Sequence, residues 1–317
     1  MNLLDRRLLF VTGKGGVGKS TVAAALSLLA AQHAKKALAC EVDAKGDLAA
    51  LFETAPLDFE PRQIFPGLSG MAMHTEASLD EYLRLQLRVP GVSKIGPLAK
   101  AFEFVATAAP GVREILTVGK LAHEVRERHY DIVVADAAAT GHVVGQLTAP
   151  QAINSLVRVG AIRNQTGWVL DILADPAQTA LVVVTTPEEM PVRETVDLVR
   201  RVRAETPVHV AAVVVNRVLP ELFSHSDEEV FERLREPAVA RKLARAAKGR
   251  VGQLQPVFDG ARLAVTLRRS RTGHLDMLRR ELGPDLPLLY VPELFTRGYG
   301  LRTTGQVADA LAAELGY

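Results

Sequence analysis

A glycine-rich segment near the N-terminus limits the possible folds more than any other part of the chain. It reads Gly13-Lys14-Gly15-Gly16-Val17-Gly18-Lys19-Ser20-Thr21 and fits the pattern G-x-x-x-x-G-K-[ST]. An apolar run, Leu8 to Thr12, precedes it, and a stretch with helical periodicity, Lys19 to Ala34, follows it. Because a strand before and a helix after are the context in which this pattern binds phosphate, the segment predicts a nucleotide-binding loop.

The residue types of this loop match the chemistry of a bound triphosphate. Glycines let the backbone wrap closely and point its N–H groups at phosphate oxygens, and the start of the following helix adds unpaired N–H groups. We expect Lys19 to contact the β- and γ-phosphates, Ser20 to ligate Mg²⁺ and Thr21 to approach the α-phosphate. The predicted nucleotide-binding residues of the loop are Gly13, Lys14, Gly15, Gly16, Val17, Gly18, Lys19, Ser20 and Thr21.

Short β-branched runs alternate with longer amphipathic stretches along the chain, which is typical of βαβ units and a parallel sheet. The predicted strands are Leu8 to Thr12, Ala37 to Val42, Gly70 to His74, Asp131 to Ala135, Ala180 to Thr185, Val208 to Val215 and Leu286 to Val291. The predicted helices are Lys19 to Ala34, Ser78 to Leu87, Val112 to Arg128, Met190 to Ala204 and Thr304 to Leu315. We therefore expect an α/β fold with a mostly parallel, doubly wound sheet of roughly seven or eight strands.

The chain of 317 residues is expected to form a single domain, 1–317, with a helical subdomain inserted at approximately 57–109 and 220–280. Pro-Gly punctuation in the first region and a basic composition in the second set them apart from the α/β pattern. The single cysteine, Cys40, excludes a disulfide framework. Neither a targeting sequence nor an apolar stretch long enough for an integral membrane segment is present, so we expect a cytoplasmic protein.

The formal net charge of +2 hides a strongly basic segment, Arg233 to Arg280, in which 13 basic residues face three acidic ones. Two interpretations stay open. The segment forms solvated faces of surface helices, or it docks an acidic partner, nucleic acid or anionic lipid. The segment lacks the interleaved aromatic residues that stack on bases, which weakens the case for a single-stranded nucleic acid. Nucleic acid is the less favoured of these partners.

Two aspartates follow predicted strands and complete the candidate site. Asp43 follows the strand that ends at Val42, where a carboxylate can position the attacking water or reach the second shell of the metal; the alternative is that it caps a turn. Asp136 follows the apolar run Ile132 to Ala135 and would hold Mg²⁺ through a water molecule.

The segment from Lys14 to Lys19 resembles the deviant Walker A motif of the dimeric P-loop ATPases, the group that contains MinD, ParA and the arsenite-pump ATPase. Matches extend across most of the chain, and the chain is most similar to a single-domain bacterial branch of the ArsA-like anion-transporting and tail-anchored-protein-targeting ATPases. The resemblance implies a dimer in which Lys14 reaches the nucleotide of the opposite subunit and neutralises charge in the transition state. On this interpretation Lys14, Lys19 and Asp43 are the candidate catalytic residues.

Three further positions are assigned by this resemblance. Asn216, in Val214-Val215-Asn216-Arg217-Val218-Leu219-Pro220, is expected to recognise adenine, because an amide can donate and accept at once. Pro292 and Glu293 resemble the loop that closes over the base, with a simple turn as the alternative.

The segment after Asp136 departs from the family pattern. Thr140, Gly141 and His142 match its switch II segment, but Ala137 and Ala139 replace a threonine and a proline. Because a hydroxyl near the γ-phosphate is lost, we expect slow hydrolysis. His142 is expected to be a switch or packing residue rather than a catalytic base.

The resulting hypothesis is a switch ATPase that uses ATP and Mg²⁺, works as a homodimer or as a heterodimer with a related ATPase, and couples nucleotide state to a protein client. One alternative is a nucleotide-binding regulatory subunit of a heterodimeric ATPase, which the two alanines suggest. The other is ParA-like positioning of DNA, which the basic segment suggests. Pumping of arsenite is disfavoured because the chain has no thiol cluster.

Overall fold

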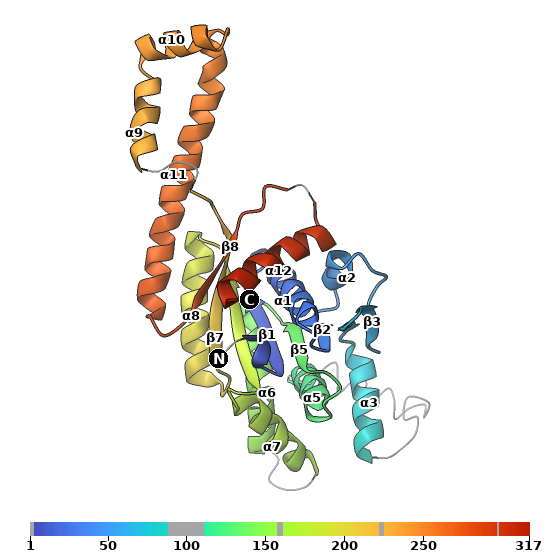
Figure 1. Cartoon of the computed structure of the whole chain (residues 1–317). Helices are drawn as coiled ribbons and strands as arrows, with labels where there is room; N and C mark the ends of the chain where they lie inside the picture. The colour runs from blue at the N-terminus through green and yellow to red at the C-terminus, as the bar shows by residue number, and fades with distance from the viewer. Residues whose placement is uncertain (1–2, 88–110, 157–160, 222–224, 297) are drawn as a thin grey trace.

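The computed structural model describes residues 3–87, 111–156, 161–221, 225–296 and 298–317. Its centre is an eight-stranded sheet with the order β3-β4-β2-β5-β1-β6-β7-β8 (Figure 1). The strands are β1 (Leu8–Gly13), β2 (Ala37–Glu41), β3 (Arg62–Phe65), β4 (Leu68–Ala72), β5 (Ile132–Asp136), β6 (Thr179–Thr185), β7 (Val210–Val218) and β8 (Leu288–Pro292). Every neighbouring pair is parallel except β3 with β4. The predicted α/β class with a mostly parallel sheet is confirmed.

Helices cover both faces of the sheet. They are α1 (Lys19–Gln32), α2 (Asp47–Leu51), α3 (Thr75–Leu87), α5 (Val112–Arg126), α6 (Thr140–Leu156), α7 (Ala161–Ala174), α8 (Glu189–Glu205), α9 (His225–Leu234), α10 (Pro237–Ala246), α11 (Val251–Leu282) and α12 (Leu301–Leu315), with a short 3₁₀ helix at Leu3–Asp5. Helices α1, α2 and α12 pack on one face. Helices α5, α6, α7, α8 and the end of α11 pack on the other.

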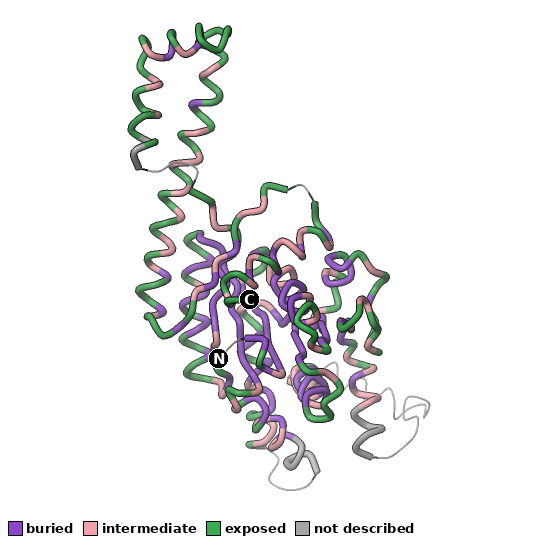
Figure 2. Tube along the Cα trace, viewed as in Figure 1, coloured by how far each residue is buried: buried purple, intermediate pink, exposed green. Residues whose placement is uncertain are grey.

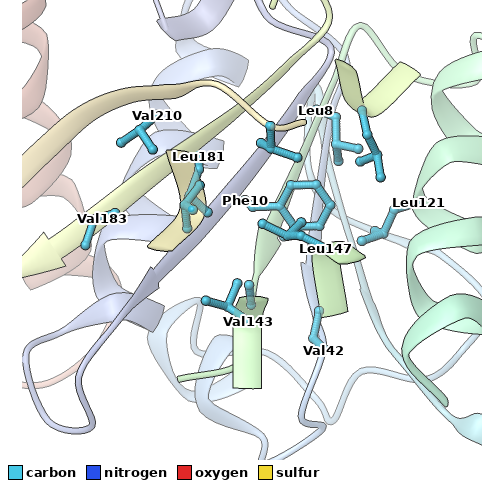
Figure 3. Close-up of a cluster of buried hydrophobic side chains, with 14 of the residues drawn as sticks. Leu8, Phe10, Val42, Leu121, Val143, Leu147, Leu181, Val183 and Val210 are labelled. Carbon is cyan, nitrogen blue, oxygen red and sulfur yellow. The ribbon is translucent and has the colours of Figure 1, made fainter. Parts of the chain in front are cut away.

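The central strands supply side chains to both cores in alternation. In β1, Leu8 and Phe10 lie in the cluster under α5 to α8, whereas Leu9 and Val11 lie in the cluster under α1 and α12. Figure 3 shows Phe10 at the centre of the first cluster, with Leu121 and Leu147 nearby. A strand that is buried on both faces needs a continuous apolar run, which explains why the sequence of β1 was recognisable as a strand.

A helical arm projects from the body of the molecule. It consists of α9, α10 and the first part of α11, while the last part of α11 returns to pack beside α8 (Figure 1). In Figure 2 the arm is mostly exposed or intermediate, in contrast to the buried sheet. Several of its large apolar side chains are exposed, namely Val230, Val251, Val257, Leu263 and Leu267.

The basic residues of the segment Arg233 to Arg280 include some that are paired near the body and some that are unpaired at the tip of the arm. Near the body, Arg268 pairs with Glu221 at 3.0 Å and Arg271 pairs with Glu188 at 3.7 Å. At the tip of the arm five basic residues are exposed and make no ion pair with any described residue: Arg241, Lys242, Arg245, Lys248 and Arg250. The tip therefore carries a cluster of five exposed positive charges.

The seven predicted strands and five predicted helices all occur, with ends shifted by a few residues. Strand β3 and helices α2, α6 and α7 were not predicted. Strand β3 is short, exposed and at the sheet edge, and α6 contains two glycines and Pro150, which are poor helix signals. Residues 57–109 contribute β3 and β4 to the main sheet before α3, and the part of this region from 88 to 110 lies outside the described residues. The proposed subdomain boundaries stay a prediction.

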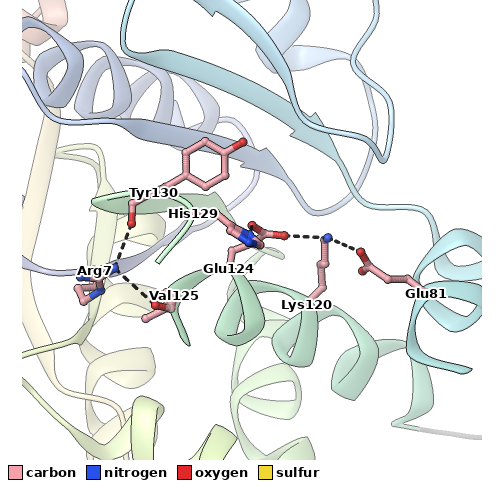
Figure 4. A network of polar contacts seen from close by, with 7 residues as sticks. All are labelled: Arg7, Glu81, Lys120, Glu124, Val125, His129 and Tyr130. Atoms are coloured by element: carbon pink, nitrogen blue, oxygen red, sulfur yellow. Dashed lines mark hydrogen bonds and ion pairs between the residues drawn. The ribbon is translucent and has the colours of Figure 1, made fainter. Parts of the chain in front are cut away.

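A buried polar network ties α3 to α5 (Figure 4). Lys120 Nζ lies 2.8 Å from Glu81 Oε1 and 2.8 Å from Glu124 Oε1. His129 Nδ1 contacts the second oxygen of Glu124 at 2.7 Å. Burial alone would lower the pKa of Lys120, but its hydrogen bonds to the two glutamates outweigh burial and raise that pKa. The network therefore holds a charged lysine in a largely buried position.

Candidate nucleotide-binding site

The glycine-rich loop leaves the carboxyl end of β1 and wraps tightly at two positions. A Cβ at Gly13 would lie 2.2 Å from the Val184 carbonyl oxygen of β6, and a Cβ at Gly18 would lie 2.4 Å from Asn216 Nδ2. Gly18 also has a φ of 94°, which favours glycine. By contrast, a Cβ at Gly15 or Gly16 would meet nothing within 4 Å. The loop thus packs against β6 and β7 at Gly13 and Gly18 and is open at Gly15 and Gly16. An open loop of backbone N–H groups of this kind can serve as an anion cradle.

Helix α1 begins directly at the loop and adds donors to it. Gly18 is the N-cap of α1 and makes no side-chain capping bond, so the first backbone N–H groups of the helix are left for a ligand. Lys19 and Ser20 are the first two residues of this helix and are partly exposed. The structure therefore places both of these predicted residues at the mouth of the cradle.

Asp136 ends β5, the strand beside β1, and its carboxyl group faces this helix start. The residue is only 7% exposed, and its Oδ1 atom has no hydrogen-bond partner. Burial raises the pKa of Asp136 to about 6, while a hydrogen bond from Ser20 and the charge of Lys19 partly oppose that shift. A buried carboxylate oxygen without a partner, next to a serine hydroxyl, fits the oxygen ligands that Mg²⁺ prefers. The described residues contain no group of three or more His, Cys, Asp or Glu side chains that could hold a metal alone, so a bound Mg²⁺ would need phosphate and water ligands as well.

Asp43 follows β2 and lies on the same edge of the sheet. Its carboxylate lies 3.6 Å from Arg113 Nη2 and 3.5 Å from Lys45 Nζ. The loop that carries it is anchored by Glu41, whose Oε1 accepts hydrogen bonds from the backbone N–H of Lys45 and Asp47. Burial raises the pKa of Glu41 even though these bonds oppose the shift. The position of Asp43 is therefore set by a buried glutamate that the sequence did not single out.

A cavity of about 460 Å³ opens beside Asp43. Its walls come from the segment after β2, from α5 and from the segment after β5, and its lining includes Arg113, Thr117, His142 and Gln146. His142 is exposed and lines this cavity, and its expected role as a switch or packing residue stays a prediction. The cavity therefore lies between the segment after β2 and the segment after β5.

Lys14 turns back onto its own chain. Its Nζ atom pairs with Glu194 Oε1 on α8, and Thr140 Oγ1 at the start of α6 donates to the other oxygen of the same carboxylate at 3.4 Å. In this single chain, Lys14 therefore contacts a residue of its own subunit. The predicted contact with a second subunit stays a prediction.

Asn216, in β7, supports the loop from behind. Its Nδ2 donates to the Val17 carbonyl oxygen at 2.8 Å, and its Oδ1 accepts from the Arg217 backbone N–H at 2.9 Å. The side chain is buried, with 7% exposed. The structure therefore gives Asn216 a contact with the phosphate-binding loop, and the predicted contact with adenine stays a prediction.

The segment after β8 carries the remaining predicted residues. Pro292 ends β8, and the Glu293 backbone N–H donates to the Val218 carbonyl oxygen at 2.9 Å. Two exposed aromatic residues follow, Phe295 at 74% and Tyr299 at 62%. Partial burial, together with the charges of Asp47, Asp136 and Glu41, raises the pKa of Tyr299, so this segment lies within the electrostatic field of the site. Phe295 and Tyr299 are therefore candidates for contact with a base, and sequence reasoning did not identify them.

Thr12 links the loop strand to the segment after Asp136. Its Oγ1 donates to the Ala138 carbonyl oxygen at 2.7 Å, and both residues are buried. Thr12 and Glu194 were missed because their contacts join positions that are distant along the chain. The contacts of Glu41 are local, but a glutamate at the end of an apolar strand carries no motif that marks it. The site as a whole is an open glycine cradle with a lysine, a serine and a buried aspartate around it, which defines a P-loop nucleotide-binding protein.

Comparison with known proteins agrees with this class. The family model described as anion-transporting ATPase matches residues 6–170 and 164–242. The chain is 31% identical to ATPase BagA of Mycobacterium tuberculosis over 97% of this chain and 93% of that protein. It is 27% identical to a putative arsenical pump-driving ATPase of Halobacterium salinarum over 89% of this chain and 44% of that protein. It is also 29% identical to ATPase get3 of Neurospora crassa over 54% of this chain and 52% of that protein.

The chain belongs to the anion-transporting ATPase family, and the resemblance drawn from its loop and switch segments is confirmed. It is an ATP-binding ATPase by this membership. Among the described residues, no helix combines the length and apolar character needed to cross a membrane.

Proposed function

We propose that this ATPase is a Mg²⁺-dependent switch in which ATP closes two subunits and hydrolysis releases them. The observation that carries the proposal is the unpartnered, buried Oδ1 of Asp136 beside Ser20 and Lys19, at the mouth of an open glycine cradle. A bound Mg²⁺ would supply positive charge to the phosphates there. Ser20 would ligate it directly, and Asp136 would hold it through a water molecule.

The other predicted residues have distinct roles in this proposal. Lys19 binds the β- and γ-phosphates, and Asp43 positions the attacking water. Lys14 leaves its own subunit on dimer closure and neutralises charge on the partner's nucleotide. Asn216 shapes the loop and contacts adenine, with Pro292 and Glu293 beside the base.

The proposed partners are a second ATPase subunit, identical or related, and a protein client. The arm is the part of the described structure most suited to a partner, because it projects from the body and exposes apolar and basic side chains together. We place the protein in the cytoplasm, where ATP is available and a lone buried thiol, Cys40, persists.

Nucleotide binding and subunit association test the proposal together. A fluorescent ATP analogue should bind more tightly with Mg²⁺ than with EDTA, and light scattering coupled to gel filtration should show a doubled mass with ATP and Mg²⁺. Lys19→Ala should abolish binding, since the loop loses its phosphate-binding cation. Retained ATP affinity in Lys19→Ala would refute the site. Binding without any doubling of mass would refute the dimeric switch alone.

One observation favours a second candidate, a regulatory subunit that pairs with a competent ATPase. The segment after Asp136 presents Ala137 and Ala138 as buried methyl groups and Ala139 as a partly exposed one, so it offers no side-chain hydroxyl before Thr140. Steady-state phosphate release by the purified chain, compared with a Lys14→Ala variant, separates the two candidates. A rate that depends on Lys14 supports a homodimeric enzyme, whereas equal background rates support the regulatory subunit.

The DNA-positioning alternative depends on the tip of the arm. Its five unpaired cations would contact phosphates without reading sequence. ATP-dependent binding of duplex DNA with a steep loss of affinity at rising salt would support this function. Absence of binding at low salt would remove it.

A further inference from the structure

The Glu194 carboxylate lies where it contacts two parts of the site at once. One oxygen pairs with Lys14 Nζ from the phosphate-binding loop, and the other accepts from Thr140 Oγ1, four residues after Asp136. Glu194 itself belongs to α8, which follows β6, the strand next to β1. One side chain from a third element therefore connects the loop with the segment after β5.

The ion pair between Lys14 and Glu194 is partly exposed, so it can break and form again. The Lys14 and Glu194 side chains are 34% and 33% exposed. Ion pairs with this exposure contribute little net stability, because water and salt compete for both partners. A triphosphate carries far more negative charge than one carboxylate, so a phosphate brought close by another subunit can take Lys14 from Glu194.

We propose that Glu194 is a positioning residue that retains Lys14 and Thr140 in the nucleotide-free subunit and releases them when the partner's ATP arrives. The inference rests on the proposed function, because it assumes that Lys14 acts on the opposite subunit. It follows that closure of the dimer costs free energy, because the Lys14–Glu194 ion pair must break first. Removal of the carboxylate should therefore make closure easier without altering the cradle that binds the subunit's own ATP.

The first test measures the ion pair itself in the nucleotide-free protein. A brief pulse of an amine-acylating reagent, followed by peptide mass spectrometry, reports how accessible Lys14 is. We expect Glu194→Gln to raise the labelling rate of Lys14 about two- to fivefold, since a neutral amide binds ammonium weakly. Glu189→Gln is the matched control, because Glu189 lies on the same helix and pairs with Arg193 at 2.9 Å rather than with Lys14. Equal Lys14 labelling in the wild type and Glu194→Gln would overturn the proposal.

The second test measures closure. In titrations of ATP with Mg²⁺, followed by mass from light scattering, Glu194→Gln should reach half-maximal dimer at about two- to fivefold less ATP than the wild type or Glu189→Gln. The difference should vanish in a Lys14→Ala background, where no pair exists to be broken. A shift that persists with Lys14→Ala, or no shift at all, would contradict the role of Glu194. A wild type that binds ATP and never dimerises would instead refute the dimeric function on which the inference rests.

Discussion

Glu41 and Asp136 lie directly opposite each other at the carboxyl ends of the neighbouring parallel strands β2 and β5, and both are buried. The two carboxyl groups occupy one small region beside the loop. Burial is the main cause of the raised pKa of Asp136, and the charge of Glu41 adds to it. Parallel register thus brings two carboxyl groups together at the place where we propose that Mg²⁺ binds. We therefore expect the binding of nucleotide to depend on pH and on Mg²⁺.

The contribution of Mg²⁺ to ATP binding should weaken as the pH falls through about 6. Burial raises the pKa of Asp136 to about 6, so the carboxylate that holds the metal is protonated below that pH. The ratio of ATP affinities with Mg²⁺ and with EDTA, measured by calorimetry from pH 5 to 8, should therefore fall toward the acid end. ATP itself titrates in this range, so Asp136→Asn is the control for the ligand's own titration. An identical pH profile in both proteins would contradict the role of Asp136.

Asp136→Asn should stabilise the nucleotide-free protein while weakening its dependence on Mg²⁺. An acid whose pKa is raised in the folded state binds a proton between the unfolded pKa of about 4 and the folded value near 6, so its charge costs stability as the pH rises through that window. The full cost at pH 7 is on the order of 2 to 3 kcal/mol. The melting temperature should rise by about 3 to 5 °C at pH 7 and by less at pH 5. A lower melting temperature at pH 7 would contradict this assignment.

Arg113→Ala should increase the rate of ATP hydrolysis several-fold without changing stability. Arg113 and Lys45 both compete for the Asp43 carboxylate, and loss of one cation leaves that carboxylate freer to accept a hydrogen bond from water. The pair is well exposed, so its loss should cost about 0.5 kcal/mol or less. Phosphate release and thermal melting measure the two effects. Arg193→Ala, which removes a surface cation paired with Glu189, is the control, and a fall in rate specific to Arg113→Ala would show that Arg113 orients Asp43 instead.

Asn216→Ala should weaken the binding of ATP and of inorganic tripolyphosphate alike, by about tenfold. The variant leaves the Val17 carbonyl oxygen without its donor and removes the side chain that packs against Gly18. In the proposed site this loop binds the phosphates whatever base is attached. Competition against a fluorescent nucleotide gives both affinities. A larger loss of affinity for ATP than for tripolyphosphate would show that Asn216 also contacts adenine. Unchanged affinity for tripolyphosphate would exclude a role of Asn216 in shaping the loop.

Lys120→Met should destabilise the protein by about 3 to 5 kcal/mol, because it leaves the buried Glu124 and its neighbour Glu81 without their cation. Denaturant unfolding measures the change. The double variant Lys120→Met with Glu124→Gln should recover part of the loss, since no buried charge is then left alone at Glu124. Equal stability of the single and double variants would contradict this explanation.

The sequence could predict those parts of the site that are local along the chain. Gly13 to Thr21 form a loop whose spacing and flanking elements are visible in order, and Asp136 follows an uninterrupted apolar strand. The contacts of Lys14 and Asn216 could not be predicted in the same way. Glu194 is 180 residues from Lys14, and Val17 is 199 residues from Asn216. On its own, Glu194 is one of several charges on an amphipathic helix. Only the order of the strands, with β6 between β1 and β7, brings these partners together.

Helix α11 is continuous over 32 residues, which corresponds to about 48 Å of rise. It starts at the basic tip of the arm and ends against α8, the helix that carries Glu194, where Arg200 and Glu281 pair at 2.6 Å. If a partner moved the tip, the displacement would pass along this one helix to α8, the helix on which the proposed restraint of Lys14 depends. The arm would then give a partner that never touches the phosphate-binding loop a direct mechanical connection to the helix beside it.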